Sequence, residues 1–189
     1  MTAIFDIVVT DKSGASGAFS FTFGAVPTTT FALNTGVAGT PTGTTMAFFD
    51  GAVQDFTRGG TVAGGKASAT NGNPFWLLGF SGSAADFWSA NTVTDDITAI
   101  QGTFNLGQDQ LTGGIGPELQ ATACLSGSVN ICGDGAMLGK DPASDFSFFD
   151  QSAFTVNVQA STVPEPNTLA LLAVIAFGLL RARRYRRLS

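Results

Sequence analysis

The chain has 189 residues and a formal net charge of −5, which is unevenly distributed. Five of its nine Lys and Arg residues lie after residue 180, whereas 13 of its 14 acidic residues lie before residue 163, so residues 1–162 carry a net charge of 4 − 13 = −9. A phosphate backbone repels such a body, which argues against nucleic acid as a partner. The sequence contains no His, which excludes Ser-His-Asp and Cys-His catalysis within this chain.

The composition of residues 1–162 is typical of short strands joined by turns. Gly, Thr, Ser, Ala, Asn and Phe are abundant, and charged residues make up 12% of the whole chain, about half the usual share. A hydrophobic share of 44% is too high for a disordered chain. We therefore expect one body, residues 1–162, followed by a separate tail, residues 163–189.

The first elements in chain order are predicted to be strands. Residues 3–10 (AIFDIVVT) already look like a strand, and residues 1–18 lack the basic and apolar segments of an export signal. We therefore expect the true start of the protein to lie upstream. In residues 17–23, Phe19, Phe21 and Phe23 alternate with polar residues, which predicts a half-buried strand.

Turn residues divide the next part of the chain. Residues 31–33 are expected to form a short strand. Asp50-Gly51 lies between two runs that contain apolar residues, 46–49 and 52–56, and predicts a type I′ hairpin. The glycine pairs at 59–60 and 64–65 are expected to mark further turns.

The second half of the body is expected to continue in strands. Residues 75–80 (FWLLGF) form a continuous apolar run, which predicts a core strand, and residues 83–90 are expected to form one helical turn or a loop. Strands are predicted at 92–100 and 102–106, with a Gly-rich connection at 111–117. In the last predicted strand, Phe154, Val156 and Val158 alternate with polar residues.

These nine to twelve short segments predict the fold class. Short strands with turn signals every 8–12 residues suggest a mostly β protein with an antiparallel β-sandwich body, jelly-roll-like in its connections. No internal repeat of fixed period is present, which argues against a solenoid.

The two cysteines, Cys124 and Cys132, bracket a segment that contains Ser126-Gly127-Ser128. A strand, a turn and a returning strand would bring the two thiols together, and in an oxidising compartment they would form a disulfide. The alternative is a pair of buried thiols. A zinc site is disfavoured because the chain has no His to complete it, and we expect no metal and no cofactor.

Acidic and aromatic residues supply the remaining candidates for chemistry. Asp95-Asp96 is a carboxylate pair, and further acids recur at Asp134, Asp141, Asp145 and Asp150. They are best interpreted as solvated loop residues; weak Ca²⁺ binding near 134–150, or glycosidase-type catalysis, is the alternative. Trp76 and Trp88 are candidates for stacking on a sugar, and Trp88 is expected to be the more exposed.

Two sequence segments imitate catalytic motifs without matching them. Residues 79–83 (GFSGS) have Ser83 where a nucleophile elbow needs Gly. Residues 133–141 have Asp134 and Asp141 where a phosphate-binding loop needs Gly and Ser or Thr. We therefore expect no enzymatic activity.

The last 27 residues have a three-part order. Val163, Pro164, Glu165 and Pro166 come first, an uncharged apolar run occupies residues 168–180, and five arginines follow: Arg181, Arg183, Arg184, Arg186 and Arg187. A helix of this length spans about 20 Å, less than the roughly 30 Å hydrocarbon core, but arginine stems can reach the interface. We expect one transmembrane helix, with the arginines cytoplasmic and residues 1–162 outside.

This arrangement resembles the PEP-CTERM sorting signal of Gram-negative bacteria. The matching residues are Val163 to Pro166, the TLALL run at 168–172, the GLL run at 178–180 and the arginine cluster. The resemblance implies recognition by an exosortase, a membrane-embedded processing enzyme, and cleavage at or near the Pro-Glu-Pro segment. It also implies release or transfer to the cell surface, often alongside exopolysaccharide and biofilm production.

The proline-containing segment suits such processing. Prolines fix φ and lack N–H donors, so residues 163–166 are expected to stay extended and unpaired, as a processing enzyme requires. The alternative is a plain single-pass anchor with a proline-containing linker. Because the resemblance covers only the tail, it does not transfer a function to the body.

Three hypotheses for the whole protein follow. The favoured one is an exported, non-enzymatic surface or matrix protein, sorted by its tail from an inner-membrane-anchored precursor, with exopolysaccharide as a further candidate partner. The second is a carbohydrate-binding module that uses Trp76, Trp88 or loop acids with Ca²⁺. The third is a glycan-acting enzyme that uses paired Asp residues.

Overall fold

The computed structural model describes residues 1–51, 61–95, 101–137 and 150–158. These residues are mostly β, and every strand pair among them is antiparallel, which confirms the predicted class. Residues Met1–Gln159 form one compact unit. The predicted boundary between residues 162 and 163 lies outside the described residues.

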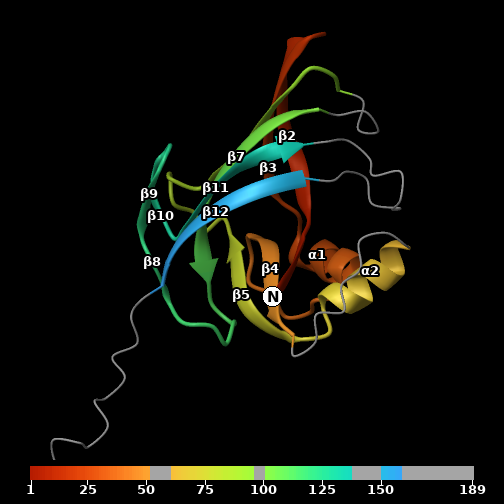
Figure 1. Ribbon diagram of the computed structural model, residues 1–189, viewed down its shortest axis with the longest axis vertical. Helices are drawn as coiled ribbons and strands as arrows, with labels where there is room; N and C mark the ends of the chain where they lie inside the picture. The colour runs from red at the N-terminus through yellow and green to blue at the C-terminus, as the bar shows by residue number, and fades with distance from the viewer. Residues whose placement is uncertain (52–60, 96–100, 138–149, 159–189) are drawn as a thin grey trace, which may run out of the picture. The chain divides into compact units, whose positions relative to one another are not determined.

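The elements of the described residues are, in chain order, β1 (Thr2–Phe5), β2 (Ile7–Ala15), β3 (Ala18–Ala25), α1 (Thr28–Thr35), β4 (Thr44–Asp50), α2 (Val62–Ala69), β5 (Asn73–Gly79), β6 (Phe87–Thr92), β7 (Gly102–Leu111), β8 (Leu119–Gln120), β9 (Thr122–Cys124), β10 (Gly127–Val129), β11 (Ile131–Met137) and β12 (Asp150–Val158). Ten of these strands form one sheet, and β9 pairs with β10 as a separate hairpin. Figure 1 shows their arrangement.

The sheet is organised around β7, which changes partner along its length. On one side, residues 102–107 pair with β6 and residues 109–111 pair with β5; on the other side β7 pairs with β11. The sheet therefore branches at Gln108 into two arms, β5–β4–β1 and β6–β3–β2. In the other direction it continues through β11 and β12 to β8.

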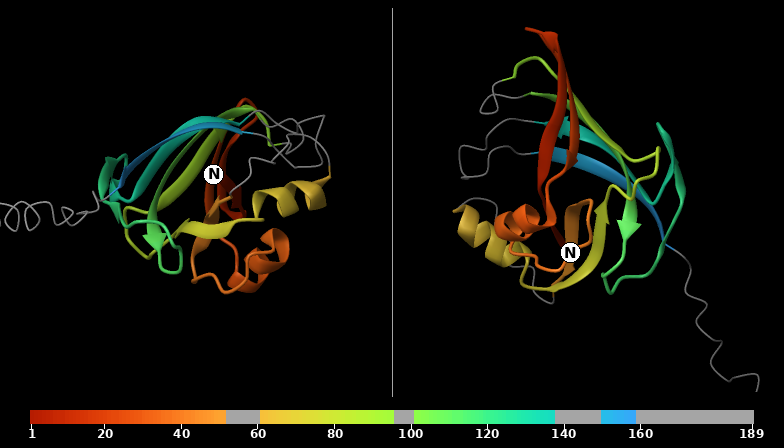
Figure 2. Two further views of the ribbon diagram at one scale, coloured as in Figure 1. Left: turned by 60° about the horizontal axis from the view of Figure 1, so that its bottom comes forward. Right: turned by 180° about the vertical axis from the view of Figure 1, so that it is seen from behind.

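The branching corrects the predicted jelly-roll-like sandwich. Its two sheets would be separate, whereas in the described residues both arms share β7 and are joined again where β1 leads into β2 at Asp6. The arms still pack together as two layers, because one aromatic core takes residues from both of them: Phe21, Phe23 and Trp88 from one arm, and Met46, Trp76 and Leu78 from the other. Figure 2 shows the two arms from other sides.

A second, smaller core lies on the opposite face of β4 and β5. Leu77 points into it together with Ala47 and Phe49, and α1 covers it with Phe31, which is fully buried. Neighbouring residues of β5 therefore enter different cores, Trp76 and Leu78 one, Leu77 the other. A strand buried on both faces carries a continuous apolar run, which confirms that residues 75–80 include a core strand.

Two segments predicted as a strand and a turn are helical. Residues 31–33 lie in α1, which follows Pro27 and ends at Gly36, whose φ of 82° is left-handed and whose N–H donates to the Ala32 carbonyl at 2.8 Å. Proline before a helix and glycine after it are ordinary boundary signals. The glycine pair at 64–65 lies in α2, whose Thr61 hydroxyl accepts from the Gly64 N–H at 3.1 Å.

Other boundaries differ from the predictions. The early strand at residues 3–10 is divided at Asp6, whose N–H donates to the Thr45 carbonyl at 2.9 Å. Residues 87–90, expected in a helical turn or loop, belong to β6, which ends at Thr92. β7 runs to Leu111, five residues past the prediction.

Some predicted elements lie outside the described residues. These are the returning strand of the Asp50-Gly51 hairpin at 52–56, part of the strand at 92–100, and the transmembrane helix at 168–180. Among the helices that the structure does describe, none combines the length and the apolar character needed to cross a membrane.

Candidate functional site

The predicted sorting residues begin a few positions after the last strand in the sequence. Val163 to Pro166 and the five arginines lie outside the described residues, so their geometry stays a prediction. The described chain comes close to them: β12 ends at Val158, with four residues between it and Val163. The candidate functional region of the body is therefore the end of β12 and the elements that hold it.

β12 pairs with two strands in succession along its length. It pairs with β11 from Met137↔Asp150 to Ile131↔Val156, and its last two residues, Asn157 and Val158, pair with β8. β8 is only two residues long, too short to hold another strand by its own ladder. Other contacts must therefore fix it.

Two side-chain amides supply those contacts at Leu119 of β8. The Leu119 N–H donates to Gln110 Oε1 at 2.6 Å, and its carbonyl accepts from Asn130 Nδ2 at 2.9 Å. The two residues are themselves linked, because the backbone N–H of Gln110 donates to Asn130 Oδ1 at 2.9 Å. The Leu119 side chain is 6% exposed and lies in the aromatic core. Leu119 is thus fixed by its backbone and by its side chain.

A disulfide closes the chain beside these amides. Cys124 and Cys132 are bonded, with a Cα–Cα distance of 5.7 Å, and they enclose β10 and Asn130. Cys132 belongs to β11, where it is the partner of Thr155 in β12 and of Gly107 in β7. A Cβ at Gly107 would meet Cys124 Sγ at 3.3 Å and the Phe87 ring at 2.6 Å. The glycine therefore makes room for the disulfide on the sheet.

A polar cluster that the sequence did not predict lies where the sheet branches. The Ser81 hydroxyl is 2.9 Å from Asp86 Oδ2 and 2.7 Å from Asp109 Oδ2, and having one proton it donates to one carboxylate at a time. The N–H groups of Ser81 and Ser83 donate to Asp86 at 2.7 and 3.2 Å. Ser81 is the central residue of the near-match GFSGS.

The position of this polar cluster follows from the branching of the sheet at β7. Residues 80–86 connect β5 to β6, the two strands that diverge from β7, and Asp109 follows the branch residue Gln108. Asp86 Oδ2 there accepts from the N–H groups of Ser81 and Ser83, which lie in the connection between the two strands. The Asn130 N–H donates to the Gln108 carbonyl of β7 at 3.1 Å and also to Asp109 Oδ1 at 3.2 Å. The arrangement is a structural support.

The branch residue itself is polar and completely buried. Gln108 is 0% exposed, and its Oε1 accepts from the Thr45 hydroxyl at 2.8 Å, so it links β7 to β4. Its Nε2 is buried without a hydrogen-bond partner in the structure. A buried amide group without a hydrogen-bond partner lowers the stability of the fold, so the Gln108 Nε2 is a destabilising group in the core.

The aromatic candidates for sugar binding are both in the core. Trp88, predicted to be the exposed one, is 4% exposed, and Trp76 is 8% exposed. Trp76 Nε1 donates to the Pro117 carbonyl at 2.9 Å, and Trp88 packs against Phe5 at a ring-centroid distance of 5.6 Å. The expectation for Trp88 is wrong because residues 87–90 form a strand that faces the core. Neither ring is available for stacking on a sugar.

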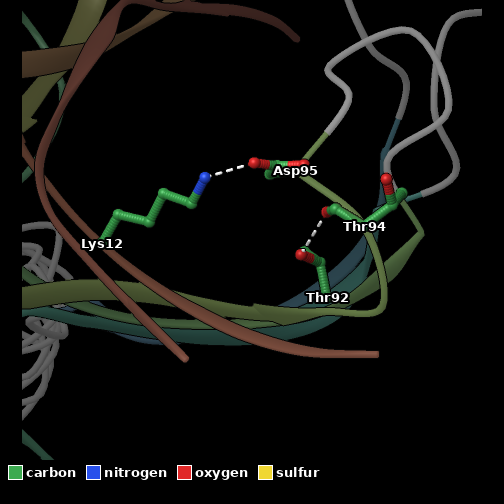
Figure 3. Close-up of polar contacts among 4 residues, drawn as sticks. All are labelled: Lys12, Thr92, Thr94 and Asp95. Atoms are coloured by element: carbon green, nitrogen blue, oxygen red, sulfur yellow. Dashed lines mark hydrogen bonds and ion pairs between the residues drawn. The ribbon is translucent and has the colours of Figure 1, made fainter. Parts of the chain in front are cut away.

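The carboxylate pair Asp95-Asp96 is only partly described. Asp95 forms an ion pair with Lys12 of β2, and Thr92 Oγ1 donates to the Thr94 carbonyl at 2.7 Å beside it (Figure 3). The hydrogen bond from Lys12 and its positive charge lower the pKa of Asp95 below its usual value. Lys12 Nζ also lies 4.7 Å from the centre of the Phe19 ring. Asp95 thus serves to hold the β2–β3 hairpin.

The acids proposed for weak Ca²⁺ binding are dispersed over described and undescribed parts. Asp134 is exposed on β11, Asp141 and Asp145 lie outside the described residues, and nothing is described of the Asp150 side chain. Within the described ranges, no group of three or more His, Cys, Asp or Glu residues is placed to hold a metal ion.

Comparison with known proteins identifies the tail. Residues 162–187 match the model of the PEP-CTERM protein-sorting motif. No curated protein and no solved structure matches the chain. A signal of this class implies an exported protein that is sorted by an exosortase, through a membrane-anchored precursor. Three residues separate the end of β12 from the start of the match. The match shows that the chain carries a PEP-CTERM protein-sorting motif.

Proposed function

We propose that this chain is a non-enzymatic protein of the cell surface or extracellular matrix, associated with exopolysaccharide or biofilm. Its body, residues 1–162, is displayed or released after an exosortase cleaves the tail at or near Val163 to Pro166. Before processing, residues 168–180 anchor the precursor in the inner membrane, with the body outside and the five arginines in the cytoplasm. The match to the sorting motif carries this proposal.

The body supports a passive role. The sequence has no His, and the polar residues nearest to a catalytic pattern, Ser81 with Asp86 and Asp109, are engaged in hydrogen bonds to backbone groups where the sheet branches. The disulfide between Cys124 and Cys132 fits an oxidising compartment. The net charge of −9 keeps such a body soluble and away from other polyanions.

The experiment compares the mass and location of the protein in cells with and without the processing enzyme. We expect the tail to be removed only where the enzyme is present, and the uncleaved precursor to remain with the membrane fraction otherwise. A triple variant, Pro164→Ala/Glu165→Ala/Pro166→Ala, should accumulate as precursor in both. An intact tail in wild-type cells would overturn the proposal.

The matrix role is tested separately from processing. Mature protein should be recovered from the extracellular matrix of wild-type cells, and its amount there should fall in a strain that makes no exopolysaccharide. Equal recovery from both strains would refute the association with polysaccharide while leaving the sorting step intact.

A further inference from the structure

The strand that leads to the sorting motif is held up to its last residue. Val158 pairs with Leu119, and the motif match begins at residue 162. A chain extends at most about 3.6 Å per residue, so Pro164 lies within about 22 Å of Val158 in any conformation. While the end of β12 remains paired, only residues after Val158 can extend the chain between the described body and the processing segment.

The pairing depends on contacts made outside β12. Leu119 is fixed by Gln110 through its N–H, by Asn130 through its carbonyl and by the core through its side chain. Pro117 is bound too, since its carbonyl accepts from Trp76 Nε1 at 2.9 Å. β7 thus holds β8 through Gln110, and the segment between β10 and β11 holds it through Asn130.

Asn130 owes its position to the disulfide-closed segment. It lies inside the ring that Cys124 and Cys132 close, between Val129, which is 0% exposed, and Ile131, which is 1% exposed. The far end of the ring is attached to the loop before β6, because the Ser126 hydroxyl donates to the Ala85 carbonyl. When the disulfide is opened, the segment that contains Asn130 loses its covalent link between Cys124 and Cys132 and is less restrained.

We propose that Gln110, Asn130 and the disulfide form a clamp that positions the processing segment. Closed, the clamp keeps Asn157 and Val158 in the sheet and fixes the number of residues between the folded body and the motif. When the clamp is open, β8 separates from β12. Asn157 and Val158 then lose their pairing, and the unpaired chain before the motif becomes longer. The clamp closes only when Cys124 and Cys132 are oxidised. Because disulfides form outside the reducing cytoplasm, the end of β12 becomes fixed only after export. The consequence for processing rests on the proposed function.

Hydrogen exchange of the full-length chain in detergent tests the clamp directly. In Cys124→Ser/Cys132→Ser, and in the wild type under reducing conditions, amides of residues 118–121 and 153–158 should exchange about tenfold faster or more, while those of β5 change far less. Unchanged exchange at 157–158, or an equal increase in β5, would overturn the proposal.

A variant that keeps the disulfide distinguishes a local opening of the clamp from a general loss of folding. Asn130→Ala removes the donor to the Leu119 carbonyl and should accelerate exchange at 118–121 and 157–158. The matched control is Gln101→Ala, on an exposed side chain before β7, which should change neither segment. If both variants behave alike, Asn130 has no positioning role.

Processing rates in cells provide the functional readout. A folded body held within about 22 Å of the cleavage segment hinders a membrane-embedded enzyme, so Asn130→Ala should speed cleavage severalfold. A flexible Gly/Ser insert of about ten residues after Gln159 should have the same effect. The two changes together should act no more strongly than the insert alone.

The outcomes separate this proposal from the previous one. Faster cleavage with the insert but not with Asn130→Ala refutes the clamp. Slower cleavage with both means that the body docks on the enzyme, and also refutes it. No cleavage of any chain refutes the proposed function, while the exchange measurements still decide whether the clamp exists.

Discussion

The outer strand of the β2–β3 hairpin and the β8–β12 end are held in different ways. β3 is held by pairing with β6 and by Phe21 and Phe23 in the core. β2 is exposed in every residue after Ile7, and beyond its pairing with β3 it contacts the rest of the body through the Lys12–Asp95 ion pair, whose side chains are 42% and 50% exposed. The β8–β12 end is fastened by a buried leucine, two side-chain amides and a disulfide. Water and salt screen the ion pair but hardly affect the contacts of the β8–β12 end.

This difference suits what each region does. The hairpin edge needs only to avoid pairing with other chains, and the register shift between Val9 and Asp11 together with Lys12 protects it. The sorting motif follows the β8–β12 end in the sequence, and the clamp proposed above acts on this end. Four changes, in order of expected effect, test the comparison.

The largest effect is expected from removing the disulfide. Cys124→Ser/Cys132→Ser opens a nine-residue ring (separation 8) and should lower the free energy of unfolding by about 2–3 kcal/mol, mainly because the unfolded chain gains freedom. Denaturant unfolding of the full-length chain measures it. A loss below about 0.5 kcal/mol would mean that the ring contributes little to holding the β8–β12 end.

The second largest loss of stability is expected when Asn130, which contacts both Gln110 and Leu119, is substituted. Asn130→Ala leaves the Leu119 carbonyl and the Gln110 N–H without their side-chain partners, which should cost about 1–3 kcal/mol. Asn130→Asp keeps the acceptor for the Gln110 N–H but turns a carboxylate oxygen toward the Leu119 carbonyl, close to Asp109, so it should cost at least as much as the alanine variant. An Asp variant as stable as the wild type would contradict the role given to the Asn130–Leu119 hydrogen bond.

A smaller effect is expected at the buried hydrogen bond between Thr45 and the branch residue Gln108. Thr45→Val removes the donor to Gln108 Oε1 in the core and should cost about 1–2 kcal/mol, because the Gln108 amide is left without a partner at either end. Combining it with Gln108→Leu should recover part of the loss, since an apolar pair leaves nothing unsatisfied. A double variant less stable than Thr45→Val would show that the amide fits its site better than the structure implies.

The smallest effect is expected at the ion pair. Lys12→Met should change stability least of the four, and its effect should vanish at about 1 M NaCl. The pKa of Asp95 is lowered in the folded state, so its contribution is present above the unfolded pKa, about 3.9, and is lost as the pH falls through the folded pKa. A salt-independent effect of Lys12→Met would instead assign its role to packing on Phe19.

Parts of the fold were predictable because local signals agree with tertiary packing there. Phe19, Phe21 and Phe23 alternate, and Phe21 and Phe23 are buried while Phe19 packs against the same core. The apolar run at 75–80 is a core strand. The cysteine spacing allows the disulfide that the structure contains, without excluding two free thiols.

Other parts followed from contacts that no local pattern carries. Phe31 looks like a strand residue, but a proline and a left-handed glycine bound a helix around it that covers the second core. Trp88 looks exposed among small residues, but β6 turns it into the first core. The Gln110–Asn130–Leu119 contacts join residues 9 to 20 positions apart in sequence, and nothing in the amino-acid order predicts them.

The sequence by itself determined that the body is β-rich and that its tail carries a sorting motif, because strand alternation and the order of prolines, apolar run and arginines are local properties. Only the tertiary structure decided that the sheet branches at Gln108 and that the last strand pairs with β8 at Val158. Both depend on which strands meet across the core, and that is set by long-range packing of side chains whose own sequence neighbours give no sign of it.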